Sequence, residues 1–152
     1  PIKSSAASDV YKRQHKNSYV GRTFIKPTQK ERQSAVHLKL SVLSSVVKGK
    51  RLVLIDDSIV RGTTMASLIR MLKDAGATEV HVRISSPPFL FPCYYGTDVP
   101  SNDQLIASSH TAAEICASIG ADSLGYMKLE DLKQMTGDLP LCKACFDSHY
   151  PV

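Results

Sequence analysis

The sequence has 152 residues, 43% of them hydrophobic and 22% charged, which fits one globular domain with a core of its own. Its formal net charge is +5, but the lysine and arginine residues are scattered without an aromatic-basic stripe, so we expect no nucleic-acid partner. No apolar run approaches the roughly 20 residues that cross a bilayer, and no secretory signal is evident, so we expect a cytoplasmic protein without a membrane partner.

Residues 1–14 differ from the rest of the chain. They show no hydrophobic periodicity and do not begin with methionine. We therefore leave them out of the fold and interpret them as a disordered or foreign leader, with the domain spanning residues 15–152.

Residues 16–33 combine basic residues with a glycine and a proline before any regular pattern begins. This composition is typical of a mobile loop over a phosphate site. Thr28 and Glu31 have the spacing of a capping box, which predicts the start of a helix. The apolar face of that helix would be formed by Val36, Leu40 and Leu43.

The stretch 51–64, RLVLIDDSIVRGTT, carries the strongest functional signal. The apolar residues 52–55 do not alternate with polar ones, which predicts a parallel strand buried on both faces. Asp56 and Asp57 would lie at its carboxyl end, where open α/β sheets bind ligands. The next residues supply hydroxyl groups and a position without a Cβ: Ser58, Gly62, Thr63 and Thr64.

The acid pair and the hydroxyl-rich turn that follows it suit two different ends of one ligand. Carboxylates accept hydrogen bonds from sugar hydroxyls and hold Mg²⁺, whereas backbone N–H groups and hydroxyls at a helix N-terminus donate to phosphate. The G-x-x-x-x-G-K-[ST] spacing of an ATP-binding loop is absent. The pattern therefore predicts a phosphorylated sugar as the ligand.

Helices and strands alternate through the rest of the chain. Apolar residues recur at helical spacing from Met65 to Gly76, where the glycine predicts the helix end. In the strand 79–86, alternate residues share a face: Val80, Val82 and Ile84. A helix at 111–119, a strand at 122–127 and a helix at 129–135 follow. This order predicts an α/β protein with a parallel sheet flanked by helices.

The four cysteines form a second pattern. Cys142 and Cys145 are spaced as C-x-x-C, and Cys93 lies in a predicted loop, which suggests metal or redox chemistry. From the residues alone, zinc held by these three cysteines and His149 is favoured, because Cys3His is a common closed zinc site. A metal cluster and unligated thiols are the alternatives. Cys116 lies inside a predicted helix and is expected to be a buried thiol.

Three stretches resemble a known family: residues 19–33 (YVGRTFIKPTQKERQ), 48–64 (KGKRLVLIDDSIVRGTT) and 85–98 (SSPPFLFPCYYGTD). From about His15 onward the chain resembles the carboxyl-terminal domain of amidophosphoribosyltransferases, which are type I phosphoribosyltransferases. The resemblance implies their α/β fold. It also implies formation of 5-phosphoribosylamine from phosphoribosylpyrophosphate (PRPP) and glutamine-derived ammonia, with release of pyrophosphate, in the first step of de novo purine synthesis. Nothing here resembles the family's glutaminase domain, so we expect a fragment of a longer chain.

The resemblance also assigns roles to residues. Lys16, Tyr19 and Arg22 match positions in a flexible loop that holds pyrophosphate and excludes water, although Ser18 departs from the basic residue usual there. Asp56 and Asp57 would bind the ribose and Mg²⁺. The 5′-phosphate would be bound by Ser58, Ile59, Val60, Arg61, Gly62, Thr63 and Thr64.

One branch of the family binds a 4Fe-4S cluster through four cysteines, and this reverses the preference for zinc. Cys93, Cys142 and Cys145 match three of the ligands, and the fourth would come from upstream sequence. The family also implies a homo-oligomer. The rival interpretation is a non-catalytic regulator that binds PRPP or a nucleotide on the same fold. A weaker one is a small zinc-stabilised interaction module.

Overall fold

The computed structural model describes residues 14–16, 40–42, 44–97, 99, 101–137 and 139–151. Tyr19 and Arg22 lie outside these residues, as does most of the helix predicted after Thr28. The elements are β1 (Gln14–Lys16), β2 (Leu40–Val42), α2 (Ser44–Val47), β3 (Arg51–Asp56), α3 (Thr63–Asp74), β4 (Glu79–Ile84), the 3-10 turns η2 (Asn102–Gln104) and η3 (Ile106–Ser108), α4 (Ala112–Ile119), β5 (Ser123–Tyr126), α5 (Leu129–Thr136) and α6 (Ala144–Asp147).

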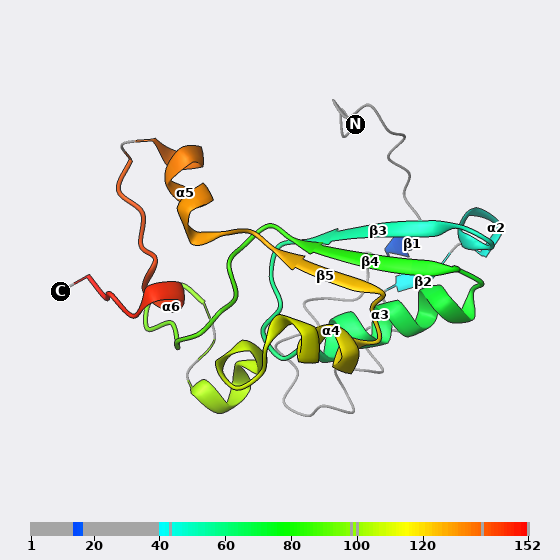
Figure 1. Ribbon diagram of the computed structural model, residues 1–152, viewed down its shortest axis with the longest axis horizontal. Helices are drawn as coiled ribbons and strands as arrows, with labels where there is room; N and C mark the ends of the chain where they lie inside the picture. Colours follow the sequence, from blue (N-terminus) through cyan, green and yellow to red (C-terminus); the bar gives the residue numbers. More distant parts are fainter. Residues whose placement is uncertain are drawn as a thin grey trace.

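The main sheet has three parallel strands in the order β3-β4-β5 (Figure 1). Leu52 pairs with Val80, and Val82 pairs with both Leu54 and Leu124, so these residues share one face. Figure 1 shows α3 and α4 together beneath that face. The predicted parallel α/β sheet with flanking helices is therefore confirmed.

Apolar side chains from the sheet and both helices form the main core. Val80, Val82 and Ile84 of β4 are buried, as their alternation predicts. They pack against residues of α3 and α4 that include Leu68, Ile69, Leu72, Ile115 and Ile119. Burial of each such side chain contributes about 1.5–3 kcal/mol, so this core is the main source of stability.

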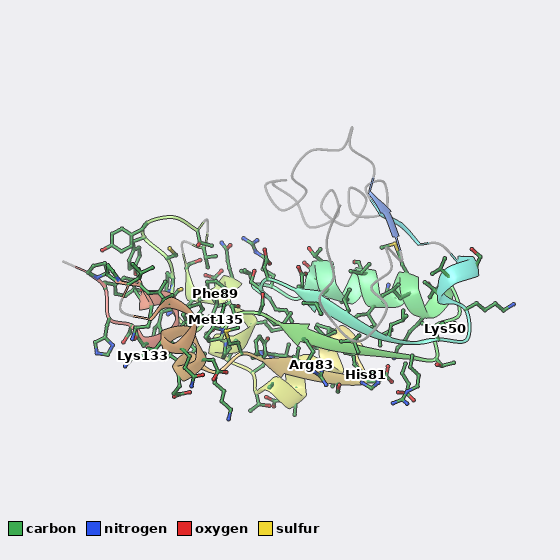
Figure 2. All side chains as sticks on the ribbon, turned by 90° about the horizontal axis from the view of Figure 1, so that it is seen from above. Lys50, His81, Arg83, Phe89, Lys133 and Met135 are labelled. Carbon is green, nitrogen blue, oxygen red and sulfur yellow. The ribbon has the colours of Figure 1, made fainter. Side chains whose placement is uncertain are left out.

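The opposite face of the sheet corrects one expectation. Val53 and Ile55 are 65% and 73% exposed, so β3 is buried on one face only. Within the described residues β3 pairs only with β4, and α3 and α4 both lie on the other side. Figure 2 looks onto this open face, where the labelled His81 and Arg83 lie on β4.

The element boundaries agree with most of the sequence signals. Thr111 caps α4 in a capping box with Glu114, and Gly120 ends it in a left-handed conformation. Leu40 lies in strand β2 and not in a helix, because it pairs with β1.

Cys116 is half-buried, not fully buried, and its thiol donates to the carbonyl oxygen of Ala121 at 3.3 Å. Among the described helices, none is long and apolar enough to span a membrane.

A smaller second core joins the turn after β3 to the cysteine-rich end of the chain. Phe89, Val99 and Leu105 are buried together, and Val60, Cys145 and Phe146 pack against them. The N–H groups of Leu90 and Phe91 both donate to the carbonyl oxygen of Cys145. The cysteine-rich end of the chain, which includes α6, therefore lies against the loop that follows β4 (Figure 1).

Candidate functional site

The turn between β3 and α3 is built around Gly62. Asp56 ends the strand, and α3 begins at Thr63 after Gly62, whose φ is 76°. This left-handed conformation is strained for any residue with a Cβ. A Cβ at Gly62 would also lie 3.3 Å from Ile106 Cδ1 and 3.4 Å from Ile119 Cγ2. Glycine is therefore required by backbone angle and by packing.

The start of α3 is ready to bind an anion. No side chain accepts a hydrogen bond as the cap of this helix. The first N–H groups of a helix have no partner within the helix, and the helix dipole places partial positive charge at the same end. Thr63 and Thr64 add two hydroxyl donors. A phosphate group suits this arrangement.

The turn lines a cavity of about 360 Å³. Its wall contains all nine residues that sequence reasoning assigned to PRPP, from Asp56 to Thr64. Met65, Thr97 and Val99 complete it. The sequence did not predict Thr97 or Val99, because their loop reaches the cavity only through tertiary packing.

Two of the residues that line this cavity carry carboxylates, Asp56 and Asp57. The N–H of Asp57 donates to Asp56 Oδ1 at 3.0 Å, and the Ser58 hydroxyl donates to Asp57 Oδ1 at 2.9 Å. Burial raises the pKa of Asp56, and the neighbouring Asp57 charge raises it further against the opposing effect of the Asp57 N–H. A cation or sugar hydroxyls at this point would restore the solvation that the Asp56 carboxylate has lost.

The turn is held in place from both sides. The N–H of Ser85, just after β4, donates to the carbonyl oxygen of Asp56 at 3.0 Å. On the other side, the N–H of Ile106 donates to the carbonyl oxygen of Val60 at 2.9 Å, and the Arg61 guanidinium donates to Gln104 Oε1. Gln104 is 43 residues from Arg61, so no local sequence signal indicated this support.

The three cysteines that the sequence predicts as metal ligands lie in one region. Burial raises the pKa of Cys145 to about 11, and the charges of Cys93 and Cys142 raise it as well. Burial alone would also raise the pKa of Cys93, but N–H groups of Tyr95, Thr97 and Gly96 outweigh it, so the pKa is lowered. Within the described ranges, no three His, Cys, Asp or Glu side chains are placed to hold a single metal ion.

The structure does not group the fourth predicted zinc ligand with the cysteines, and it describes little of the predicted flexible loop. The side chain of His149 is 87% exposed, and its ring nitrogen lies 3.6 Å from Asp147 Oδ1, so among the described residues it is not grouped with the cysteines as the zinc prediction expected. Lys16 lies in β1, and its side chain is outside the described part of the structure, as are Tyr19 and Arg22 entirely. The contribution of that loop stays a prediction.

Comparison with known proteins agrees with the geometry of the cavity. The model of the phosphoribosyl transferase domain matches residues 9–85, which include β3, the Gly62 turn and α3. This chain belongs to the phosphoribosyl transferase domain family. The turn that the sequence predicts to bind phosphate falls within the matched region of this phosphoribosyl transferase domain.

Curated relatives confirm the resemblance to amidophosphoribosyltransferases. The chain is 52% identical over 139 residues to the amidophosphoribosyltransferase of Synechocystis sp., covering 90% of this chain and 28% of the relative. It is 54% identical over 136 residues to that of Methanocaldococcus jannaschii, covering 90% and 29%. The phosphoribosyl transferase domain described here thus spans less than a third of these relatives' length.

A solved structure confirms the fold. The glutamine PRPP amidotransferase of Bacillus subtilis, complexed with ADP and GMP, superimposes with a TM-score of 0.75 at 51% sequence identity. The match covers 91% of this chain and 32% of the other. The type I phosphoribosyltransferase-like α/β fold expected from the sequence is therefore correct.

Proposed function

We propose that this chain is the phosphoribosyl-transferring part of an amidophosphoribosyltransferase. It would transfer the 5-phosphoribosyl group of PRPP to glutamine-derived ammonia and release pyrophosphate, as the first step of purine synthesis. The observation that carries this proposal is the cavity at the carboxyl end of β3, which gathers two carboxylates, several hydroxyls and the start of α3. The names of the relatives support the same reaction.

Each group in the cavity has a role in this reaction. N–H groups at the start of α3, with the hydroxyls of Thr63 and Thr64, hold the 5′-phosphate. Asp56 and Asp57 accept hydrogen bonds from the ribose hydroxyls. As the bond from the anomeric carbon to pyrophosphate breaks, positive charge develops on that carbon, and the ammonia nitrogen forms the new bond and then loses a proton. Positioning and charge stabilisation supply the catalysis, without a covalent intermediate.

The same carboxylates fit Mg²⁺. Their oxygen atoms are the donors that Mg²⁺ prefers, and proteins commonly hold it through one or two carboxylates together with substrate phosphates. Asp56, whose pKa is raised by partial desolvation of its carboxylate, is the group that gains most from a nearby cation. Bound there, Mg²⁺ would neutralise charge on the departing pyrophosphate. Lys16, Tyr19 and Arg22 would close the site and exclude water.

We also propose that Cys93, Cys142 and Cys145 are ligands of a 4Fe-4S cluster. The three thiols influence one another electrostatically, yet no described group of side chains has the geometry of a single-ion site. We propose a cluster and not zinc because Cys93, Cys142 and Cys145 match three of the four cluster ligands in one branch of the resembled family.

Iron analysis tests the cluster. We expect brown protein after anaerobic purification, with iron and sulfide lost in Cys142→Ser. Cys116→Ser is the matched control, because Cys116 lies in α4 and bonds to Ala121, and it should keep its iron. Colourless wild-type protein with stoichiometric zinc would contradict the proposal.

Pyrophosphate release tests the reaction itself. Release should require both PRPP and ammonia, and calorimetry should show binding of Mg-PRPP weakened at least tenfold in Asp57→Asn. Asp74→Asn is the matched control, because Asp74 is an exposed carboxylate at the far end of α3. Binding of PRPP without pyrophosphate release would favour the non-catalytic regulator. The glutaminase partner domain, the homo-oligomer and the cytoplasmic location stay predictions.

A further inference from the structure

The loop that carries Cys93 also forms part of the cavity wall. We call residues 93–97 and 99 the cysteine loop. Its first residue is Cys93, and two later ones, Thr97 and Val99, line the cavity. The N–H of Cys93 donates to the carbonyl oxygen of Val99 at 3.0 Å, and the N–H of Thr97 donates to Cys93 Sγ at 3.4 Å. The sulfur atom is thus bonded to the backbone of a wall residue.

The second core connects this loop to the phosphate-binding turn. Val99 is 2% exposed and packs in the cluster to which Val60 of the turn also belongs. Cys145 and Phe146 pack against the same cluster, and the rings of Phe146 and Phe89 lie 5.1 Å apart. A displacement of Val99 would therefore disturb both Val60 and the cysteine-rich end, because a packed core transmits changes in shape.

The C-terminal segment holds the cysteine loop from outside. The Tyr150 hydroxyl donates to the carbonyl oxygen of Pro92 at 2.7 Å, and the rings of Tyr150 and Tyr94 lie 4.9 Å apart. The Tyr95 hydroxyl donates to the carbonyl oxygen of Pro151 at 2.6 Å. On the cavity side, the loop is held by the bond from the Cys93 N–H to Val99 and by the hydrogen bond from the Thr97 N–H to Cys93 Sγ.

We propose that the cysteine loop forms a functional part of the wall of the phosphosugar site, and that Cys93 is a positioning residue for PRPP. Its sulfur accepts a hydrogen bond from the Thr97 N–H, and this bond keeps Thr97 and Val99 beside the phosphate-binding turn. This role rests on the proposed function, and it gives Cys93 a task in substrate binding in addition to cluster ligation. Because coupling between two sites is reciprocal, bound PRPP must also restrain Cys93.

Removal of the Thr97 N–H tests the bond while every cysteine is kept. Thr97→Pro deletes the donor and the hydroxyl, whereas Thr97→Ala deletes the hydroxyl alone. We expect Thr97→Pro to bind Mg-PRPP about fivefold more weakly than Thr97→Ala, which corresponds to about 1 kcal/mol. The KM for PRPP should rise by the same factor with kcat unchanged, at equal iron content. Equal affinity in the two variants would overturn the proposal.

Cysteine variants provide a second test that does not depend on tolerance of proline. Cys93→Ala, Cys93→Ser and Cys142→Ala each lack one proposed cluster ligand, so they are compared in the same cluster-free state. Cys93→Ala should bind Mg-PRPP about fivefold more weakly than Cys142→Ala. Cys93→Ser should recover most of that loss, because its hydroxyl accepts the Thr97 N–H.

The outcomes separate this proposal from the proposed function. Equal weakening in both Cys93 variants, or none in Cys93→Ala relative to Cys142→Ala, would overturn the positioning role while leaving PRPP binding in place. Failure of the wild-type protein to bind Mg-PRPP would refute the proposed function, and the positioning role with it.

Discussion

Replacement of Gly62 by alanine tests whether the turn before α3 forms the phosphate site. The φ of 76° costs a residue with a Cβ about 1–2 kcal/mol, and the lower entropy of the unfolded alanine chain offsets about 0.4–1 kcal/mol of it. The new Cβ would lie 3.3 Å from Ile106 Cδ1 and 3.4 Å from Ile119 Cγ2, which adds about 1 kcal/mol of overpacking. We expect the free energy of unfolding to fall by about 2 kcal/mol.

Gly120 provides the matched control for this experiment. Its φ of 73° is nearly the same, it ends α4, and nothing lies within 4 Å of a Cβ built on it. Gly120→Ala should therefore show the backbone strain alone, a loss of about 1 kcal/mol. Urea denaturation of both variants measures the difference, provided the slope of the transition is unchanged.

Ligand binding distinguishes a phosphate site from a merely tight turn. Gly62→Ala shifts the N–H groups that begin α3, so we expect calorimetry to show at least tenfold weaker binding of Mg-PRPP. Gly120→Ala should bind it as the wild-type protein does, because Gly120 does not line the cavity. If the two variants lose the same stability and bind PRPP equally, our account of the turn is refuted.

Three further changes test the supports of the fold. Asp122 accepts the Val80 N–H at 2.7 Å, which lowers its pKa, so its stabilisation is present above the unfolded pKa of about 3.9 and is lost as the pH falls through the lower folded value. Asp122→Asn should cost about 1 kcal/mol in urea denaturation at pH 7 and almost nothing at pH 2; an equal cost at both would contradict this. Gln104→Ala frees Arg61 and should raise the KM for PRPP severalfold while the melting temperature changes little, whereas unchanged kinetics would show that the bond is not needed. Ile69 is 1% exposed, so Ile69→Ala should lower the unfolding free energy by about 2–5 kcal/mol. A loss below about 1 kcal/mol would mean that the core repacks into the space left by the removed side-chain atoms.

Patterns within one segment predicted the local structure well. The alternation of Val80, Val82 and Ile84 identified β4, and Thr111 with Glu114 marked the start of α4. The run from Asp56 to Thr64 predicted a ligand site, and these residues line one cavity because a strand end, a glycine and a helix start are adjacent in sequence as well as in space.

Such local patterns could not predict that the second face of β3 is exposed, or which distant segments support the candidate site. Val53 and Ile55 are as apolar as buried strand residues, but exposure depends on which elements cover them, and α3 and α4 both lie on the other side. Gln104 likewise supports the cavity wall through Arg61, and the cysteine loop forms part of that wall, through contacts between segments distant in sequence.

The sequence by itself thus determined the elements and the chemistry of the turn, because hydrophobic periodicity, glycine conformation and carboxylate placement act over a few residues. Only the tertiary structure decided that Val99 packs in the same core as Val60 and that Thr97 and Val99 line the cavity beside the turn after β3. These contacts join segments tens of residues apart, so they arise from packing of the whole chain and leave no local pattern.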